Sequence, residues 1–184
     1  MRSKISIMLV IFSCLMLSVR AQNGYTNKAE AKNELKNGAK EGKWLEYTGG
    51  GTSILRSDSE GAVTYVLTVY KSGKPLGVVR EYDMNDNLTR ETPYQNGDIN
   101  GVEKMYHDNG AHLETPYKNG KKNGIEKLFD GDGKLSSETP YINDQESGVV
   151  KEYYESGKLK SATTYKNGVP GETKNYDESG KLTQ

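Results

Sequence analysis

The segment Gly124-Ile125-Glu126-Lys127-Leu128-Phe129 contains the pattern that decides the fold. In an extended chain Ile125, Lys127 and Phe129 point to one side and the residues between them to the other, and this period of two predicts a β-strand. The next residues, 130–133 (Asp-Gly-Asp-Gly), are typical of a tight turn because Gly adopts positive φ without steric cost. Residues 135–141 are expected to form the return strand, so the whole segment predicts a β-hairpin.

The same pattern recurs every 23 or 24 residues along the chain. Each copy has a Gly, then usually a β-branched residue, a basic residue and an aromatic residue. The five copies begin at Gly77, Gly101, Gly124, Gly148 and Gly171. A fixed period in this range indicates a repeat array, in which each unit buries its apolar surface on its neighbours. The predicted fold is therefore all-β, an elongated, open and twisted single-layer antiparallel meander of about ten to twelve strands.

The return strands contain the tripeptide Thr-Pro-Tyr, preceded each time by Glu. Proline cannot donate a hydrogen bond to a sheet, so we expect Pro93, Pro116 and Pro140 at a strand end or at a β-bulge. The links between units carry a turn pair, such as Asn96-Gly97. Because two short strands and two turns fill each period, each unit is predicted to be one hairpin.

The pattern is irregular before Gly77. Residues 42–76 contain the only Trp, Trp44, and a Gly-rich stretch at 48–52 that is expected to form a loop. They are predicted to form a capping β unit, which a repeat array needs because its terminal repeat lacks one neighbour. Residues 22–41 are polar and are expected to form a mobile tail or a short first helix. Residues 77–184 form the repeat region.

Residues 1–21 have the order of a secretory signal peptide: a basic start, an apolar run from Ile5 to Leu17 and small residues before Gln22. Cleavage after Ala21 would export the chain to the periplasm or the extracellular space. Two alternatives are an uncleaved anchor and a lipoprotein anchored through Cys14, the only cysteine. After cleavage at Ala21 no cysteine remains, which excludes disulfides and thiolate chemistry.

Composition restricts the classes of partner. Residues 1–21 hold three of the 25 basic residues and no acidic residue, so the remainder carries a net charge of −3. A nucleic-acid partner usually requires a strongly basic domain, and none is expected here. The chain has 13 Tyr and only two Phe. Its aromatic side chains are thus largely amphipathic and suit half-exposed faces.

At these residues the chain resembles the MORN-repeat proteins. Their units also run about 23 residues, with an aromatic residue before an Asn/Gly turn and a second Gly that opens the next strand. The best-matching stretches are residues 94–101, 117–124 and 165–171. Two departures are Asn143-Asp144 at one link and Glu172 in the last unit. The chain is most similar to a bacterial variant of the repeat found in proteins labelled as antitoxin components.

The resemblance implies an all-β scaffold used for assembly, protein contacts or, in some relatives, membrane contacts. It implies no catalytic residues and no cofactor. No residue pattern here indicates membrane contact. A classical antitoxin meets its toxin in the cytoplasm, which fits poorly with an exported chain.

Candidate catalytic and metal-binding residues are few. His107 and His112, the only histidines, are expected to be surface turn residues, since zinc would require further ligands. The run at 130–133 lacks the downstream Glu of a calcium loop. No metal site is predicted. An alternative function is a small hydrolase that uses carboxylates near Trp44; two carboxylates with raised pKa values in one pocket would support it.

The recurring basic and aromatic residues are the candidate binding residues. They should lie on one face, on every second strand, with the basic residues roughly 9–10 Å apart. Such rows could hold an acidic or sugar-bearing polymer by stacking and cation–π contacts, or the aromatic side chains could pack on each other under the Lys stems. The residues are Arg80, Lys104, Lys127, Lys151 and Lys174, with Tyr82, Tyr106, Phe129, Tyr153 and Tyr176.

The sequence therefore predicts an exported, non-enzymatic scaffold that binds a protein or an envelope component. The second prediction is an envelope immunity protein that caps a toxin. Homo-oligomers could form through the open sheet edge near residues 174–182.

Overall fold

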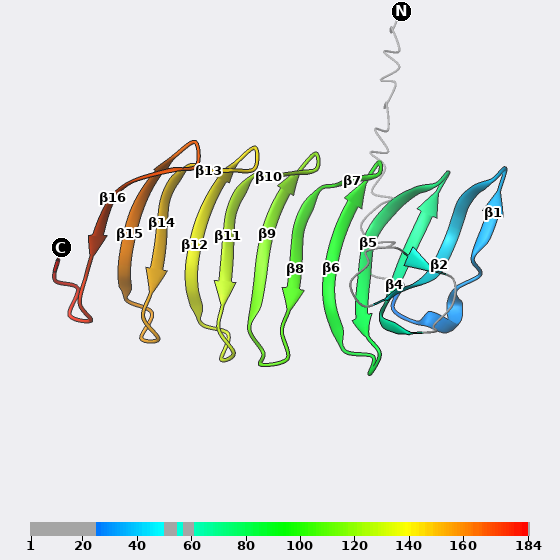
Figure 1. Cartoon of the computed structure of the whole chain (residues 1–184), viewed down its shortest axis with the longest axis horizontal. Coiled ribbons are helices and arrows are strands. Elements are labelled where there is room, and N and C mark those ends of the chain that lie inside the picture. The colour runs from blue at the N-terminus through cyan, green and yellow to red at the C-terminus, as the bar shows by residue number, and fades with distance from the viewer. Residues whose placement is uncertain (1–24, 50–54, 57–60, 184) are drawn as a thin grey trace, which may run out of the picture.

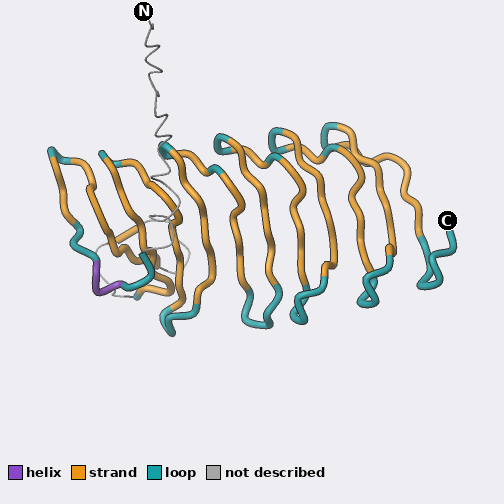
Figure 2. The backbone as a smooth tube through the Cα atoms, turned by 180° about the vertical axis from the view of Figure 1, so that it is seen from behind, coloured by secondary structure: helices purple, strands orange, loops and turns teal. Residues whose placement is uncertain are grey.

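The computed structural model describes residues 25–49, 55–56 and 61–183, and it confirms the all-β prediction (Figure 1). The strands form one open, 16-stranded antiparallel sheet. Strands that neighbour each other along its main path follow one another in the chain, so the sheet is a meander whose two ends lie far apart (Figure 2). The predicted signal peptide, Cys14 and residues 50–52 of the predicted loop at 48–52 lie outside the described residues.

Twelve strands form the main path. They are β1 (Glu34–Lys36), β2 (Ala39–Gly49), β4 (Ala62–Lys71), β5 (Lys74–Asp83), β6 (Leu88–Gln95), β8 (Gly101–Tyr106), β9 (His112–Lys118), β11 (Gly124–Phe129), β12 (Leu135–Ile142), β14 (Gly148–Tyr153), β15 (Leu159–Lys166) and β16 (Val169–Asn175). Four two-residue strands pair beside it: β3 (Leu55–Arg56), β7 (Asp98–Ile99), β10 (Lys121–Lys122) and β13 (Gln145–Glu146).

Each repeat is a hairpin that begins at the repeat Gly and ends at the Tyr of the return strand. Gly124 of β11 pairs with Tyr141 of β12, and Gly101 of β8 pairs with Tyr117 of β9. The two turn types also repeat. In the turn after β11, Asp130 Oδ1 accepts hydrogen bonds from the backbone N–H groups of Asp132 (3.0 Å) and Lys134 (2.9 Å). This Asp therefore holds the turn together.

The link turns require two consecutive residues with positive φ. Asn119 and Gly120 have φ of 52° and 79°, the combination that suits a two-residue hairpin turn. At the link where the sequence departs from Asn-Gly, Asn143 and Asp144 adopt φ of 49° and 70°. Asn and Asp tolerate this left-handed region better than other side chains, so the turn is preserved.

The motif prolines lie inside strands rather than at strand ends, which corrects one of the two predicted placements. Each proline faces a break in the adjacent strand. Opposite Pro93, β7 ends at Ile99 and β8 begins at Gly101. The N–H group of Asn100, which lies between these two strands, donates to the carbonyl of Pro93 (2.9 Å). The repeat Gly packs against this ring. A Cβ built on Gly124 would lie 2.8 Å from Pro116 Cγ. The repeat Gly and the motif Pro thus recur together because they pack against each other.

The N-terminal segment closes the first end of the sheet. A mobile tail or a short first helix was expected for residues 22–41, and the described part has a short 3-10 helix followed by strands. It contains a single 3-10 turn, η1 (Lys28–Glu30), and the edge strand β1. Tyr25 is buried against Tyr65 and Leu67 of β4. The cap therefore includes residues before the predicted boundary at Gly42.

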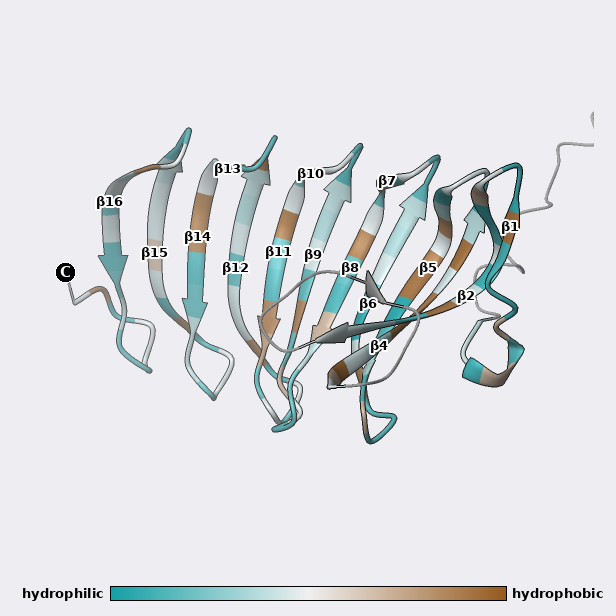
Figure 3. Ribbon diagram, turned by 45° about the vertical axis from the view of Figure 1, so that its right-hand side comes forward, coloured by the Kyte–Doolittle hydropathy of each residue, from teal (hydrophilic) through white to brown (hydrophobic). Residues whose placement is uncertain are grey.

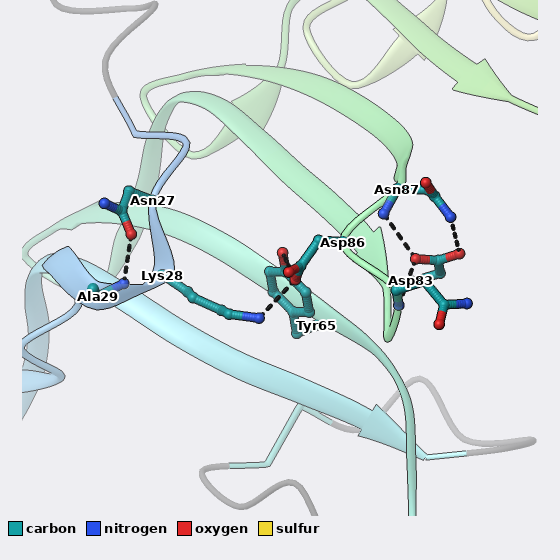
Figure 4. A network of polar contacts seen from close by, with 8 residues as sticks. Asn27, Lys28, Ala29, Tyr65, Asp83, Asp86 and Asn87 are labelled. Atoms are coloured by element: carbon teal, nitrogen blue, oxygen red, sulfur yellow. Dashed lines mark hydrogen bonds and ion pairs between the residues drawn. The ribbon is translucent and has the colours of Figure 1, made fainter.

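Polar contacts fasten this segment to the turn between β5 and β6 (Figure 4). Lys28 Nζ lies 2.6 Å from Asp86 Oδ1, which also accepts a hydrogen bond from the Tyr65 hydroxyl (2.8 Å). Asp83 holds the same turn by accepting from the backbone and side-chain N–H groups of Asn87. Within the described residues no helix has the length and hydrophobicity needed to cross a bilayer.

Candidate binding face

The recurring basic residues lie on one face of the sheet, as predicted. The register places Lys104 of β8 opposite Glu114 of β9, and Glu114 opposite Lys127 of β11. The basic residues occupy every second strand of the main path. We call this face, which carries Lys104 and Lys127, the ladder face. The opposite face carries the Tyr that ends each return strand, such as Tyr117 and Tyr141, and we call it the tyrosine face.

Acidic residues stand between the basic ones, which the sequence pattern alone did not reveal. The Glu that precedes each Thr-Pro-Tyr lies directly across from them, so the row alternates in sign: Arg80, Glu91, Lys104, Glu114, Lys127, Glu138, Lys151. Lys104 Nζ lies 2.7 Å from Glu114 Oε1, and this hydrogen bond raises the pKa of Lys104. The row is thus a ladder of cross-strand ion pairs rather than a continuous basic rail.

The recurring basic residues differ in burial and in ion pairing. Arg80 is buried at 7% exposure; its Nε contacts Glu91 Oε1 at 2.9 Å and its Nη1 donates to the carbonyl of Tyr25 at 3.2 Å. Arg80 therefore fastens the N-terminal cap to the first repeat. Lys151 lies 3.4 Å from Glu138, and Lys174 makes only a long, exposed contact with Glu172 (3.9 Å).

Lys127 is the free cation of the ladder. Among the described residues it forms no hydrogen bond or ion pair, although Glu114 and Glu138 flank it in the register. Glu114 is engaged by Lys104, while Glu138 accepts from both Lys151 and the Tyr153 hydroxyl. The charge of Lys127 is therefore available to a ligand.

The aromatic residues form a second row beside the ladder. Tyr65 and Tyr82 stack at the cap with ring centroids 5.1 Å apart and planes 10° apart. In the repeats, His112 stacks on Phe129 at 4.5 Å and 7°, and Tyr106 lies 6.2 Å away on its other side. The prediction that His112 is a surface turn residue was wrong: it is a half-buried strand residue that completes the stack, whereas His107 is exposed in its turn.

Hydroxyl groups tie the aromatic row to the ladder. The Tyr153 hydroxyl donates to Glu138 Oε2 at 2.9 Å, and the Tyr106 hydroxyl reaches Glu91 Oε2 at 3.3 Å. Burial and the hydrogen bond to Glu138 raise the pKa of Tyr153 to about 12. In the described residues, Tyr82, Tyr106 and Phe129 thus make their ring contacts with Tyr65 or His112 and not with one another.

A third row on the ladder face is apolar and exposed. Val102, Ile125 and Val149 each stand opposite a motif proline of the hairpin or its equivalent and are 45%, 49% and 42% exposed. Figure 3 shows hydrophobic bands across β8, β11 and β14 at one level. Among the described residues, the cap covers this face near β2, β4 and β5, through Tyr25. The ladder face of the repeats therefore combines exposed apolar side chains with a row of charges.

The tyrosine face has its own repeating contacts, which were not singled out from the sequence. Thr115 of the motif is 3% exposed and donates to Glu126 Oε2 at 2.8 Å, as Thr92 donates to Glu103 Oε2. Lys122 Nζ contacts Glu126 at 2.7 Å and lies 4.6 Å from the ring centroid of Tyr141. The recurring Thr before each motif Pro could have indicated these contacts in the sequence, because the Thr side chain faces away from the ladder.

Catalytic and metal-binding alternatives have limited geometric support. Within the described ranges no three His, Cys, Asp or Glu side chains are placed to hold a metal ion. A pocket of about 490 Å³ lies near the Trp44 unit, but among the described residues Glu81 is the one carboxylate that lines it, where a hydrolase would use a converging pair. Glu46, beside Trp44, is ion-paired with Lys40 and accepts from the Tyr70 hydroxyl at 2.9 Å. The hydrolase alternative stays a prediction.

Comparison with known families identifies the repeat. The family described as the MORN repeat variant matches residues 99–119, 122–143 and 146–167. These three segments cover the hairpins of strands β8 and β9, β11 and β12, and β14 and β15, and each ends at the first residue of a link turn. A search among curated proteins found no match to the chain. The matches concern the repeat alone, so the antitoxin label stays a prediction, and they support a MORN-repeat protein.

Proposed function

We propose that this protein is an exported, non-catalytic repeat scaffold that binds a partner protein through the ladder face of its repeats. The observation that supports it best is the exposed apolar row of Val102, Ile125 and Val149 beside the charged ladder. MORN repeats are scaffold units, which agrees with a surface rather than a cleft. Export rests on the signal-like order of residues 1–21.

The chemistry of this face favours a protein over a polyanion. Lys104 and Lys151 are each paired with a Glu of the ladder, so a long acidic polymer would meet alternating attraction and repulsion. A protein surface can present apolar groups to Ile125 and a carboxylate to Lys127 at the same time. Interfaces of this kind combine a small apolar centre with charged groups that set orientation.

The test is a pull-down from the native envelope fraction with tagged residues 22–184, read by mass spectrometry. Ile125→Ser with Lys127→Ala should remove the partner, because it takes away one exposed apolar contact and the free cation. The matched control is Leu128→Ser with Lys121→Ala. Leu128 is also exposed (37%) but lies on the tyrosine face, and Lys121 is exposed in the two-residue strand β10.

One dominant protein, lost with the first double variant and kept with the control, is the expected result. Loss with the control alone would place binding on the tyrosine face. Retention on purified envelope polymer without any protein partner would refute the proposal in favour of glycan binding. Both double variants should retain the wild-type circular dichroism spectrum.

A further inference from the structure

A pocket on the tyrosine face carries features that the repeats lack. It has a volume of about 490 Å³, within the range of small-molecule sites. Residues of β2, β4, β5 and β6 line it, so it lies where the irregular cap meets the first repeat. It is on the side of the sheet opposite the ladder face and is independent of the proposed partner site.

Two opposite charges face this pocket without neutralising each other. Glu81 of β5 and Arg90 of β6 are cross-strand neighbours and both line it. No ion pair joins them, or joins Arg90 to any other carboxylate in the described part of the chain. The Nε atom of Arg90 is buried and has no hydrogen-bond partner there. An unpartnered buried donor is costly, and Arg90 thus lines the pocket as a guanidinium whose charge no carboxylate of the described residues compensates.

One oxygen of the Glu81 carboxylate is held by a hydrogen bond. Its Oε1 accepts a hydrogen bond from the Thr64 hydroxyl at 2.9 Å, which orients the carboxylate and leaves Oε2 without a protein donor in the described residues. The β5–β6 register shifts directly after Glu81, between Glu81 and Tyr82. A bulge of this kind re-aims neighbouring side chains and interrupts regular pairing.

Between and around the charges the walls are apolar or neutral. Val66 and Val79 contribute aliphatic surface, while Tyr70 and Tyr94 contribute phenol rings. Burial raises the pKa of both phenols, so they stay neutral donors and acceptors near pH 7. The described lining residues therefore offer one cation, one anion and an apolar surface.

We propose that this pocket binds a small zwitterion of the amino-acid or short-peptide class, with its carboxylate on Arg90 and its ammonium group on Glu81. A simple anion would lie close to the Glu81 carboxylate, and a simple cation close to the Arg90 guanidinium. A zwitterion satisfies both, and an aliphatic side chain would contact Val66 and Val79. A planar guanidinium also suits the two oxygens of a carboxylate.

The test uses isothermal titration of residues 22–184 with the dipeptide Leu-Ala and two blocked forms. N-acetyl-Leu-Ala lacks the ammonium group and Leu-Ala amide lacks the carboxylate. Each blocked form should bind about ten- to a hundredfold more weakly than Leu-Ala, the loss expected when a buried charged group is left unpaired. Glu81→Gln and Arg90→Gln should weaken Leu-Ala binding similarly, while the matched variants of exposed residues outside both sites, Glu155→Gln and Lys118→Gln, should not.

Saturable binding of Leu-Ala that depends on both of its termini is the expected result. Absence of binding at millimolar Leu-Ala, or equal binding of the blocked forms, would overturn the proposal without any substitution in the protein. Binding that survives both pocket variants would place the ligand elsewhere and would also overturn it. Because the partner pull-down depends on the other face, its outcome is separate from this one.

Discussion

Replacing Gly124 by Ala tests how the repeats are held together. Gly124 has φ of +127°, a region that residues with a Cβ rarely occupy, and the new Cβ would lie 2.8 Å from Pro116 Cγ and 3.1 Å from its Cβ. The ring belongs to the preceding strand and cannot rotate away. Backbone strain and overpacking together should cost about 2–5 kcal/mol of unfolding free energy.

Gly120→Ala is the matched control. Gly120 also has positive φ (+79°), but no atom lies within 4 Å of the position that a Cβ would take there, so only the conformational cost of about 1–2 kcal/mol applies. Urea unfolding followed by circular dichroism measures both. Pro116→Ala in the Gly124→Ala background should recover part of the loss, because it removes the clashing ring. The reasoning is refuted if Gly124→Ala costs no more than Gly120→Ala and Pro116→Ala gives no recovery.

Three further predictions concern the cap and the ladder. Arg80→Ala should lower the unfolding free energy by about 3–5 kcal/mol because it leaves Glu91 without its buried partner, whereas Lys174→Ala at the exposed end should change it by under about 0.5 kcal/mol in the same urea assay. Tyr25→Ala should cost about 3 kcal/mol through loss of the cap core, visible as an earlier change in Trp44 fluorescence; an unchanged midpoint would mean that residues 25–33 do not cap the sheet. The pKa of Tyr153 is raised to about 12 from 10.0, so the unfolded state loses this proton first and the unfolding free energy should fall between pH 10 and 12. Tyr153→Phe should make that fall shallower. An identical pH profile of the variant would count against the hydrogen bond to Glu138.

The repeat pattern determined most of what could be predicted about the fold. Alternation from Gly124 to Phe129, the turn residues and the period were enough for the hairpins, their order and the shared face of the basic and aromatic residues, because these depend on local geometry. The position of the prolines could not be predicted in the same way. Whether Pro116 ends a strand or faces a break in its neighbour depends on how strands pair, and that is a tertiary property.

The site was predicted only in part for a related reason. The Glu before each Thr-Pro-Tyr is evident in the sequence, yet its cross-strand contact with a Lys depends on the register between repeats. The same holds for His112, whose ring completes a stack with Phe129 from a different strand. The capping role of Tyr25 follows from a contact between residues far apart in the sequence, with Arg80 donating to its carbonyl.

Site-specific photocrosslinking tests the central claim most directly. A photoreactive amino acid replaces Ile125 in one protein and Leu128 in another; both positions are exposed and on β11, but they face opposite sides of the sheet. After irradiation in the native envelope fraction, the account predicts a covalent adduct with one partner protein from position 125 and none from position 128. An adduct from position 128 alone, or from neither position while the partner still co-purifies, would contradict binding through the ladder face.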